Sequence, residues 1–319
     1  MRRLHLLSVV VPCHDEEGVL ETTHQRLSLV LADLVKREKC VNYEVLYVNN
    51  GSMDDTQRVL ERIFQQDKQV RILSLRRNFG YQGSISAGMF YAKGDAVVTI
   101  DADLQDPPEK IGEMIDSFQG DYDLVLGVRK TRFSDSFLKR FLSQTYYRFL
   151  RGMGVDVVYN HGDFRLMARA LVNEFNDLSE RNRFIRALIL KLEAHYAIVY
   201  YDREPRRLGR SKFDIHSLLA LSIDGITSFS YVPLRLASIF GFLTCLGALI
   251  GIGWVFYIKI CTKVIPGWAS TLLPIFAFGG FQLLVLGIIG EYIGRLYMEV
   301  KRRPLFVVRK EYCHATPLY

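Results

Sequence analysis

Two long runs without a charged residue stand in the last third of the chain, and they limit what it can fold into. They are Leu236–Ile258 and Trp268–Gly290, and each exceeds the ~20 apolar residues that a helix needs to cross a bilayer. Buried helices of soluble proteins are rarely so long and so free of charge. The sequence therefore predicts a two-helix transmembrane hairpin joined by Lys259–Gly267, with two buried soluble helices as the alternative.

Basic residues flank the predicted hairpin at its outer ends, in a chain of formal net charge +7. They are Arg203, Arg206, Arg207, Arg210 and Lys212 before it and Arg295, Lys301, Arg302 and Arg303 after it, whereas the connection has only Lys259 and Lys263. Short cytoplasmic segments carry an excess of Lys and Arg, so both termini are predicted to be cytoplasmic. Basic residues beside a bilayer also attract anionic headgroups.

The N-terminus and the cysteines indicate a reducing compartment. The segment "MRRLHLLSVVVP" begins basic and turns apolar like a signal peptide, but "CHDEE" follows where a cleavage site of small residues should lie. We therefore interpret this segment as a first strand. The five cysteines form no closely spaced pair, which argues against disulfides and structural zinc.

Residues 1–228 have the pattern of a soluble α/β protein. Strands are predicted at Leu6–Val11, Tyr43–Val48, Val70–Leu75, Ala96–Ile100 and Leu124–Val128, and helices near Val19–Lys36, Thr56–Gln66, Gly83–Ala92 and Pro108–Phe118. This alternation predicts βαβ units and a doubly wound, mostly parallel sheet. Ligands of such sheets bind at the carboxyl ends of the strands.

Polar side chains follow four of the predicted strands. They occupy residues 12–17 after the first strand, 49–56 after the second, 77–80 after the third and 101–106 after the fourth. Each group by itself fits a turn or a helix cap. Four such groups at one edge of a sheet indicate a binding site.

The stretch "VVTIDADLQDPPEKI" places Asp101 and Asp103 directly after a buried strand. Two carboxylates aimed at one point repel each other, and without a cation one would take up a proton. Mg²⁺ or Mn²⁺ removes this conflict, because such ions are commonly held by one or two carboxylates together with substrate phosphates. No glycine-rich phosphate loop follows the first strand, so a metal and basic side chains must neutralise the phosphates.

Several blocks of the sequence resemble one family. "VVVPCHDEE", "NNGSMDDT", "RNFGYQGSISAG", "DADLQDPPE" and "GDFRLM" resemble family-2 glycosyltransferases of the GT-A fold. With "RLGRSKF", the hairpin and "GEYIGRLY", the chain resembles polyprenyl-phosphate glycosyltransferases, the group of bactoprenol glucosyltransferases, aminoarabinose transferases and dolichyl-phosphate mannose synthases. The resemblance spans about residues 6–308, looks closest to the bactoprenol glucosyltransferases, and is most specific in "DADLQDPPE" and "GEYIGR".

The resemblance implies transfer of a sugar from a nucleoside-diphosphate sugar to polyprenyl (undecaprenyl) phosphate, with Mg²⁺ or Mn²⁺ as cofactor. Glucose from UDP-glucose is the favoured donor. The reaction would take place on the cytoplasmic face of a bacterial inner membrane. The expected partners are the donor, the polyprenyl phosphate, the lipid bilayer and further copies of the chain in a homo-oligomer, with no nucleic acid. The predicted domains are a GT-A catalytic domain (1–212), an interfacial helix (213–230), the hairpin (231–298) and a cytoplasmic tail (299–319).

The resemblance also assigns roles to individual residues. The nucleotide sugar would contact Pro12, Glu16, Asn50, Asp101, Gln105 and Ser211, and the metal would be held by Asp101, Asp103 and Gln105. The lipid phosphate would face Arg129, Lys139, Arg140 and Ser143. Asp103, Arg129, Asp163 and Lys212 are the candidate catalytic residues. Ser211 and Lys212 would lie on a loop that closes over the donor phosphates.

The sequence departs from the family pattern in three places. Asn49 and Asn50 stand where the family usually has two aspartates, and an amide keeps one acceptor but adds a donor. His14-Asp15-Glu16 replaces "Y-N-E", and Asn160 stands where many members have an acid. These departures bear on donor affinity and nucleotide preference.

The proposed chemistry is a single displacement that inverts the anomeric centre. A phosphate monoester is already anionic and needs little help from a base, so the enzyme must position it and stabilise the leaving diphosphate. Asp163 either orients the acceptor or is a structural acid paired with Arg165, and Glu291 is expected to pair with Arg295. The alternatives are a processive membrane glycan synthase, against which the missing "QxxRW" motif argues, and a sugar-nucleotide-binding scaffold that has lost turnover.

Overall fold

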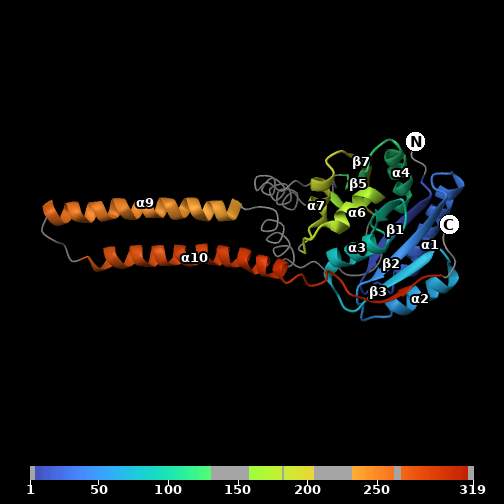
Figure 1. The fold of residues 1–319 in the computed structure, drawn as a ribbon, viewed down its shortest axis with the longest axis horizontal. Helices are drawn as coiled ribbons and strands as arrows, with labels where there is room; N and C mark the ends of the chain where they lie inside the picture. Colours follow the sequence, from blue (N-terminus) through green and yellow to red (C-terminus); the bar gives the residue numbers. More distant parts are fainter. Residues whose placement is uncertain (1–3, 131–157, 182, 205–231, 262–266, 315–319) are drawn as a thin grey trace. The chain divides into compact units, whose positions relative to one another are not determined.

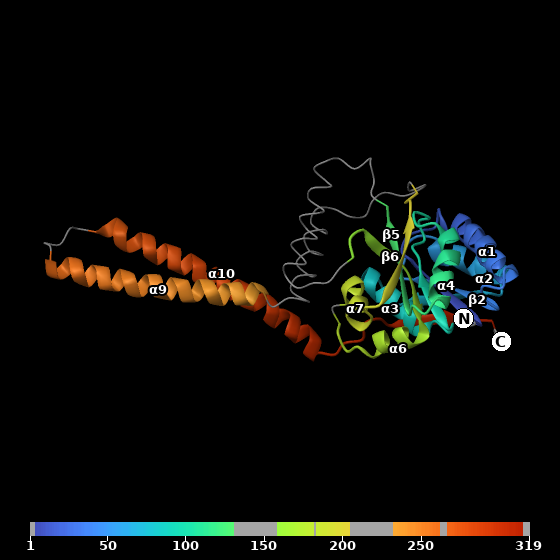
Figure 2. The ribbon, with the colours of Figure 1, turned by 90° about the horizontal axis from the view of Figure 1, so that it is seen from above.

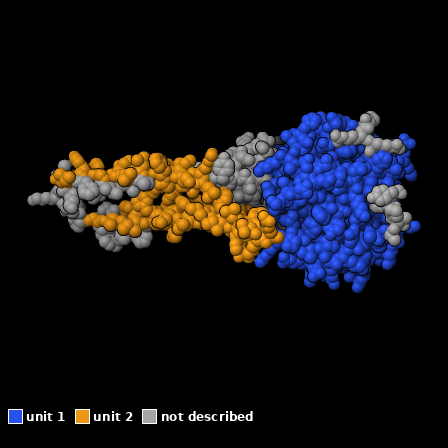
Figure 3. Space-filling view, viewed as in Figure 1, with its two compact units in different colours: residues 1–151, 156–215, 303–319 blue, residues 152–155, 216–302 orange. Residues whose placement is uncertain are grey.

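The computed structural model describes residues 4–130, 158–181, 183–204, 232–261 and 267–314. The chain divides into two compact units, which are coloured separately in Figure 3. One consists of residues 1–151, 156–215 and 303–319, and the other of residues 152–155 and 216–302. The first unit contains Asp103, Arg129 and Asp163, which were predicted to be catalytic, and the second unit contains the two apolar helices.

The first unit is built on an eight-stranded sheet (Figure 1). Its strands are β1 (Leu6–Cys13), β2 (Asn42–Asn49), β3 (Val70–Leu75), β4 (Ala96–Thr99), β5 (Leu124–Arg129), β6 (His161–Ala168), β7 (Tyr196–Tyr201) and β8 (Val308–Tyr312). The spatial order is β7-β5-β6-β4-β1-β2-β3-β8. β1, β2, β3 and β4 are parallel, so their carboxyl ends meet at one edge, as the sequence predicted.

Helices cover both faces of the sheet. They are α1 (Leu20–Lys36), α2 (Thr56–Gln66), α3 (Gly80–Tyr91), the short 3₁₀ helix η1 (Pro108–Lys110), α4 (Ile111–Gln119), α6 (Arg169–Asp177) and α7 (Ile185–Leu192). The apolar stripes of α1, α2 and α4 pack into one core cluster against the sheet. α3, α6 and α7 lie against one another and against β1, β2 and β6 on the opposite face (Figure 2).

The five predicted strands and the four predicted helices are all present within three residues of their expected ends. The prediction of a mostly parallel sheet is only partly right, because the sheet is mixed. β6 runs antiparallel to both β4 and β5, and β8 runs antiparallel to β3. The sequence analysis did not predict β6, β7, β8, α6 or α7.

The C-terminal segment, expected as a tail, supplies the edge strand β8. A buried polar network holds it in place, in which Arg71 donates to Glu44 Oε2 and to Glu311 Oε1, both at 2.6 Å. Arg71 and Glu44 are almost completely buried. Tyr312 adds a hydrogen bond of 2.7 Å to Glu61. Residues 308–312 are therefore part of the α/β unit.

The second unit contains α9 (Val232–Cys261) and α10 (Trp268–Val300), which lie side by side in Figures 1 and 2. The rings of Phe240 and Phe281 meet edge to face at 6.1 Å. Among the described residues, Ala277–Val300 is long and apolar enough to cross a membrane, and Ala237–Gly251 is a shorter apolar stretch. By length and composition, the described residues thus contain one helix that could span a membrane, and not the two that the sequence predicted. Arg295 does pair with Glu291, at 3.1 Å, as expected.

Candidate active site

The turn after β4 carries the predicted metal-binding pair. Ile100 N donates to Val10 O at 3.1 Å, which holds the end of β4 against β1. The chain then turns through Leu104, whose φ of 57° is in the left-handed region. Asp103 Oδ1 accepts a hydrogen bond of 3.1 Å from the backbone N–H of Gln105. These bonds fix Asp101 and Asp103 on one short turn at the carboxyl edge of the sheet.

A tyrosine from α3 contacts this turn. The Tyr81 hydroxyl donates a hydrogen bond of 2.5 Å to Asp101 Oδ1. Burial, followed by the charges of Asp106 and Asp163, raises the pKa of Asp101 to about 7, and the bond from Tyr81 opposes this rise. Asp103 makes the smallest contribution to this rise, so the conflict at Asp101 comes mainly from its burial and from Asp106 and Asp163, and not from the predicted repulsion between Asp101 and Asp103. A cation at this turn would favour the charged form of Asp101.

Beside the turn, Arg129 and Tyr201 contact Asp106, which is almost fully buried. Asp106 Oδ1 accepts a hydrogen bond of 2.6 Å from the Tyr201 hydroxyl, and the guanidinium of Arg129 lies 3.5 Å away. Arg129 also donates to the Tyr201 hydroxyl at 3.2 Å. A Cβ at Gly162 would come within 2.8 Å of Arg129 Nη2, so the glycine of "GDFRL" makes room for this guanidinium.

Asp163 lies between two arginines. It pairs with the fully buried Arg165, and it accepts a hydrogen bond of 2.6 Å from Arg186 of α7. Burial by itself would raise the pKa of Asp163, but the charges of Arg186 and Arg165 hold it well below its usual range. The structure thus shows the pairing with Arg165 that was one of the two predicted roles, and it adds Arg186 as a second partner.

The loops after β1 and β2 are locked together. Asp15 N donates to Ser52 Oγ at 3.1 Å, and Met53 N donates to Asp15 Oδ1 at 2.8 Å. Glu16, half-buried, has its backbone N–H fixed on Thr56 Oγ1 at 2.9 Å. Pro12 lies in β1, opposite Val48 of β2. Glu16, one of the residues predicted to contact the nucleotide sugar, is therefore held by two interlocked loops.

Both asparagines that replace the family's usual aspartates use their amide groups. Asn50 Nδ2 donates to Asn78 Oδ1 and to Gly80 O, both at 3.1 Å, and its Oδ1 accepts from Phe79 N at 2.9 Å. Asn49 Nδ2 donates to Gln57 Oε1 at 2.7 Å. Asn50 consequently joins the end of β2 to the loop between β3 and α3.

Comparisons with known proteins decide the family. Residues 8–176, more than half of the chain, match the family described as Glycosyl transferase family 2. The chain belongs to glycosyltransferase family 2. It is a glycosyltransferase of the GT-A type, which agrees with the resemblance found in its sequence.

Relatives match this glycosyltransferase over nearly its whole length. An uncharacterized glycosyltransferase of Bacillus subtilis (strain 168) is 44% identical over 96% of this chain and 94% of its own. The bactoprenol glucosyl transferase of Shigella phage SfII is 35% identical over 96% of this chain and 98% of its own. A prophage bactoprenol glucosyl transferase homolog of Escherichia coli (strain K12) is 34% identical over 95% and 98%.

The carboxylates on the turn after β4 fit a divalent cation that is also bound by a substrate. In the described part of the chain, no group of three or more His, Cys, Asp or Glu side chains could hold a metal ion by itself. Asp101 and Asp103 offer hard oxygen ligands on one turn, which is the usual protein contribution where substrate phosphates complete the coordination. A cation here would therefore depend on a bound diphosphate.

The structure gathers most, but not all, of the predicted site residues. Gln105 lies beside Asp103, and its carbonyl accepts a hydrogen bond of 3.0 Å from Glu204 N, which links the turn to the segment that follows β7. Lys139, Arg140, Ser143, Ser211 and Lys212 lie outside the described residues. The sequence analysis missed Tyr81, Arg186 and Tyr201. Asp106 was visible as the third acid of "DADLQD" but received no role.

Proposed function

We propose that this glycosyltransferase moves a sugar from a nucleoside diphosphate to polyprenyl phosphate by a single, inverting displacement. The observation that carries the proposal is the turn that presents Asp101 and Asp103 together at the carboxyl edge of the sheet, with Arg129 nearby. Relatives named bactoprenol glucosyl transferase support a polyprenyl acceptor and favour glucose, with UDP-glucose as the donor.

The residues of the site divide the work of the reaction. Pro12, Glu16 and Asn50 lie at the ends of β1 and β2, where the nucleotide would bind, and Ser211 is assigned to the donor phosphates by the family resemblance. Asp101, Asp103 and Gln105 would hold Mg²⁺ or Mn²⁺, which stabilises negative charge on the leaving diphosphate when bound. This division leaves no side chain with the task of a nucleophile.

The acceptor phosphate is itself the nucleophile. As an anion at neutral pH it needs orientation more than deprotonation, and Arg129, Lys139, Arg140 and Ser143 are proposed to provide this orientation. Lys212 would neutralise phosphate charge during transfer. Asp163 would act through Arg186, whose guanidinium it holds at 2.6 Å. The residues around the acceptor phosphate would therefore act by orienting it and by neutralising its charge.

We further propose that α9 and α10 form a membrane hairpin whose two outer ends are cytoplasmic. Large apolar side chains point outward all along both helices, among them Phe242, Leu249, Trp254 and Leu283, each more than 60% exposed. Soluble proteins rarely expose apolar patches of this extent. A bilayer would cover them, and it would also supply the polyprenyl acceptor.

A transfer assay tests the proposed function. Purified full-length protein is mixed with undecaprenyl phosphate and radiolabelled UDP-glucose, and radioactivity is counted in the lipid extract. We expect transfer with Mg²⁺ or Mn²⁺, none in EDTA, and none from Asp103→Ala, while Asp116→Ala, an exposed acid on α4, serves as the control with normal activity. Full transfer in EDTA would refute the metal role, and absence of transfer from any of several sugar nucleotides would refute the function.

A further inference from the structure

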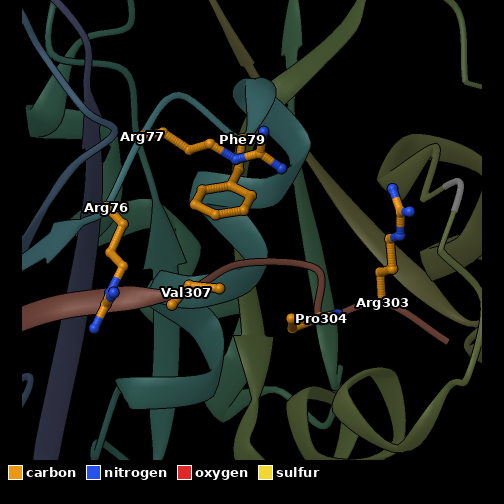
Figure 4. Close-up of a pocket in the computed structure, with 6 residues that line it drawn as sticks. All are labelled: Arg76, Arg77, Phe79, Arg303, Pro304 and Val307. Carbon is orange, nitrogen blue, oxygen red and sulfur yellow. The ribbon is translucent and has the colours of Figure 1, made fainter.

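A pocket lies between the loop that follows β3 and the segment that precedes β8. It has a volume of ≈ 280 Å³ and is lined by Arg76, Arg77, Phe79, Arg303, Pro304 and Val307 (Figure 4). Phe79, Pro304 and Val307 contribute apolar groups to its lining, and in Figure 4 the guanidinium of Arg76 points away from those of Arg77 and Arg303. The function proposed above assigns nothing to this pocket.

The two walls of the pocket are fixed relative to each other by the sheet. Leu75 of β3 pairs with Val308 of β8, and Arg76 N donates to Val307 O at 2.9 Å. The Arg77 guanidinium lies over the Phe79 ring, 4.9 Å from its centroid. The pocket is therefore a built feature of the α/β unit and not a chance gap between two loose loops.

The charges around the pocket are uncompensated. In the part of the chain that the structure describes, Arg76, Arg77 and Arg303 form no ion pair, and all three are exposed. Other arginines of the same unit, such as Arg26 and Arg71, each contact two carboxylates. Guanidinium groups without a carboxylate partner attract an anion. They suit phosphate in particular, because the planar guanidinium group of arginine can donate two parallel hydrogen bonds to phosphate oxygens.

The position of the pocket along the chain indicates which anion is available. Arg303 comes three residues after Val300, the last residue of the candidate membrane span Ala277–Val300. Three residues extend at most ~10 Å, so covalent connection alone keeps Arg303 near the end of that span. Lys301 and Arg302 precede it directly. An anion next to the end of a membrane helix is most simply a lipid headgroup.

We propose that the pocket formed by Arg76, Arg77, Phe79 and Arg303 binds an anionic membrane phospholipid. The guanidinium groups of Arg77 and Arg303 hold the phosphate, and the apolar lining takes the glycerol and the first carbons of the acyl chains. The site differs from the proposed site of the reacting acceptor, because Arg129, Lys139, Arg140 and Ser143 are not among its lining residues. It would tie the α/β unit to the bilayer at the point where the chain leaves α10.

The test is a titration of purified full-length protein in nonionic detergent with dihexanoyl phosphatidylglycerol, followed by calorimetry. Parallel titrations use dihexanoyl phosphatidylcholine, inorganic phosphate and UDP. The variants are Arg77→Gln and Arg303→Gln, and the matched control is Arg309→Gln, an exposed arginine of β8 that does not line the pocket. Thermal unfolding of each variant checks that the fold is kept.

We expect saturable binding of phosphatidylglycerol, no binding of phosphatidylcholine, and an affinity about tenfold lower in each pocket variant, the usual scale for one charged hydrogen bond. Arg309→Gln should bind like the unchanged protein. The acceptor KM and the turnover in the transfer assay should stay the same in Arg303→Gln and Arg309→Gln, which separates this proposal from the proposed function.

Four results would overturn the proposal. Equal phosphatidylglycerol affinity in the pocket variants would show that the lipid binds elsewhere. Inorganic phosphate binding as tightly as the lipid would mark a site for free phosphate. Displacement of the lipid by UDP would assign the pocket to the nucleotide, which is a real alternative because Asn78 and Phe79 bond to Asn50. A raised acceptor KM would assign it to the polyprenyl phosphate.

Discussion

The Tyr81 hydroxyl lies 2.5 Å from Asp101 Oδ1 and joins helix α3 to the turn after β4. The bond stabilises the carboxylate form of Asp101 in surroundings that otherwise favour its protonated form. A proton and the proposed metal cation would therefore compete for the oxygen atoms of Asp101. Because the pKa of Asp101 is raised to about 7, this competition should change with pH in the neutral range.

The metal requirement should depend on pH. With its pKa raised to about 7, Asp101 is about one-tenth ionised at pH 6 and about nine-tenths ionised at pH 8. A cation binds the ionised form, so the Mn²⁺ concentration for half-maximal transfer should fall about tenfold over this interval. The measurement is a series of Mn²⁺ titrations of the transfer rate at fixed pH. A constant half-maximal concentration would contradict the argument.

Removal of the Tyr81 hydroxyl should increase the metal requirement. A hydrogen bond to a charged group contributes ~1.5–3 kcal/mol, so Tyr81→Phe should raise the pKa of Asp101 by at least about one unit. At pH 7 the half-maximal Mn²⁺ concentration would then rise about fivefold, and the rate at saturating Mn²⁺ would change less. Tyr200→Phe, an exposed tyrosine of β7, is the control. Identical Mn²⁺ titrations for the two variants would show that Tyr81 does not support Asp101.

Asp163 should matter for stability before it matters for catalysis. It faces the fully buried Arg165, and removal of one partner of a buried ion pair typically costs about 3–5 kcal/mol. Asp163→Asn should therefore lower the free energy of unfolding by an amount of this order, measured by thermal unfolding. Because the folded pKa lies below the unfolded value of ~3.9, this contribution is present above pH 4 and is lost as the pH falls further. An Asp163→Asn protein as stable as the original would disprove the structural role.

Labelling from outside the cell tests the topology of the hairpin. The chain has an exposed native cysteine, Cys313, on the proposed cytoplasmic side. In a chain with Cys245 and Cys261 changed to Ser, an impermeant maleimide should label Gly267→Cys in intact cells and leave Cys313 unlabelled. Permeabilised cells should show both labels. Labelling of Cys313 in intact cells would reverse the proposed orientation.

The parts of the fold that the sequence revealed have a clear apolar pattern, unbroken in strands such as β3 and periodic in helices such as α2. β3, at Val70–Leu75, was predicted to the residue, and its side chains are all buried. β6 was not predicted, because Asp163 and Arg165 alternate in it with apolar residues and look like a solvated segment. Their burial depends on Arg186 of α7, which only the tertiary structure brings to them.

In the candidate site, too, local patterns were predicted from the sequence, whereas contacts made only in the tertiary structure were not. Asp101 and Asp103 were predicted because both follow one strand directly, so their proximity is local. Tyr81 and Tyr201 were missed, because their contacts depend on how α3 and β7 pack against distant parts of the chain. Sequence reasoning found the residues at the strand ends but not the residues that hold them.

Asn50 is an amide for a structural reason, and replacing it with the family's usual acid should destabilise the protein. Its Nδ2 donates to Asn78 Oδ1 and to Gly80 O. Asn50→Asp would place a carboxylate oxygen against both of these oxygens, and the backbone carbonyl of Gly80 cannot rotate to offer a donor. We expect a loss of about 1–3 kcal/mol in the free energy of unfolding, the usual cost of a buried group left without its partner. Asn49→Asp is the matched control, because the Nδ2 of Asn49 donates to one acceptor, the side chain of Gln57, whereas that of Asn50 donates to two. Thermal unfolding of the two variants should therefore show a clear loss for Asn50→Asp and a smaller one for Asn49→Asp. Equal losses would mean that the loop after β3 adapts to either residue, and that the two amides are not required by the hydrogen bonds seen here.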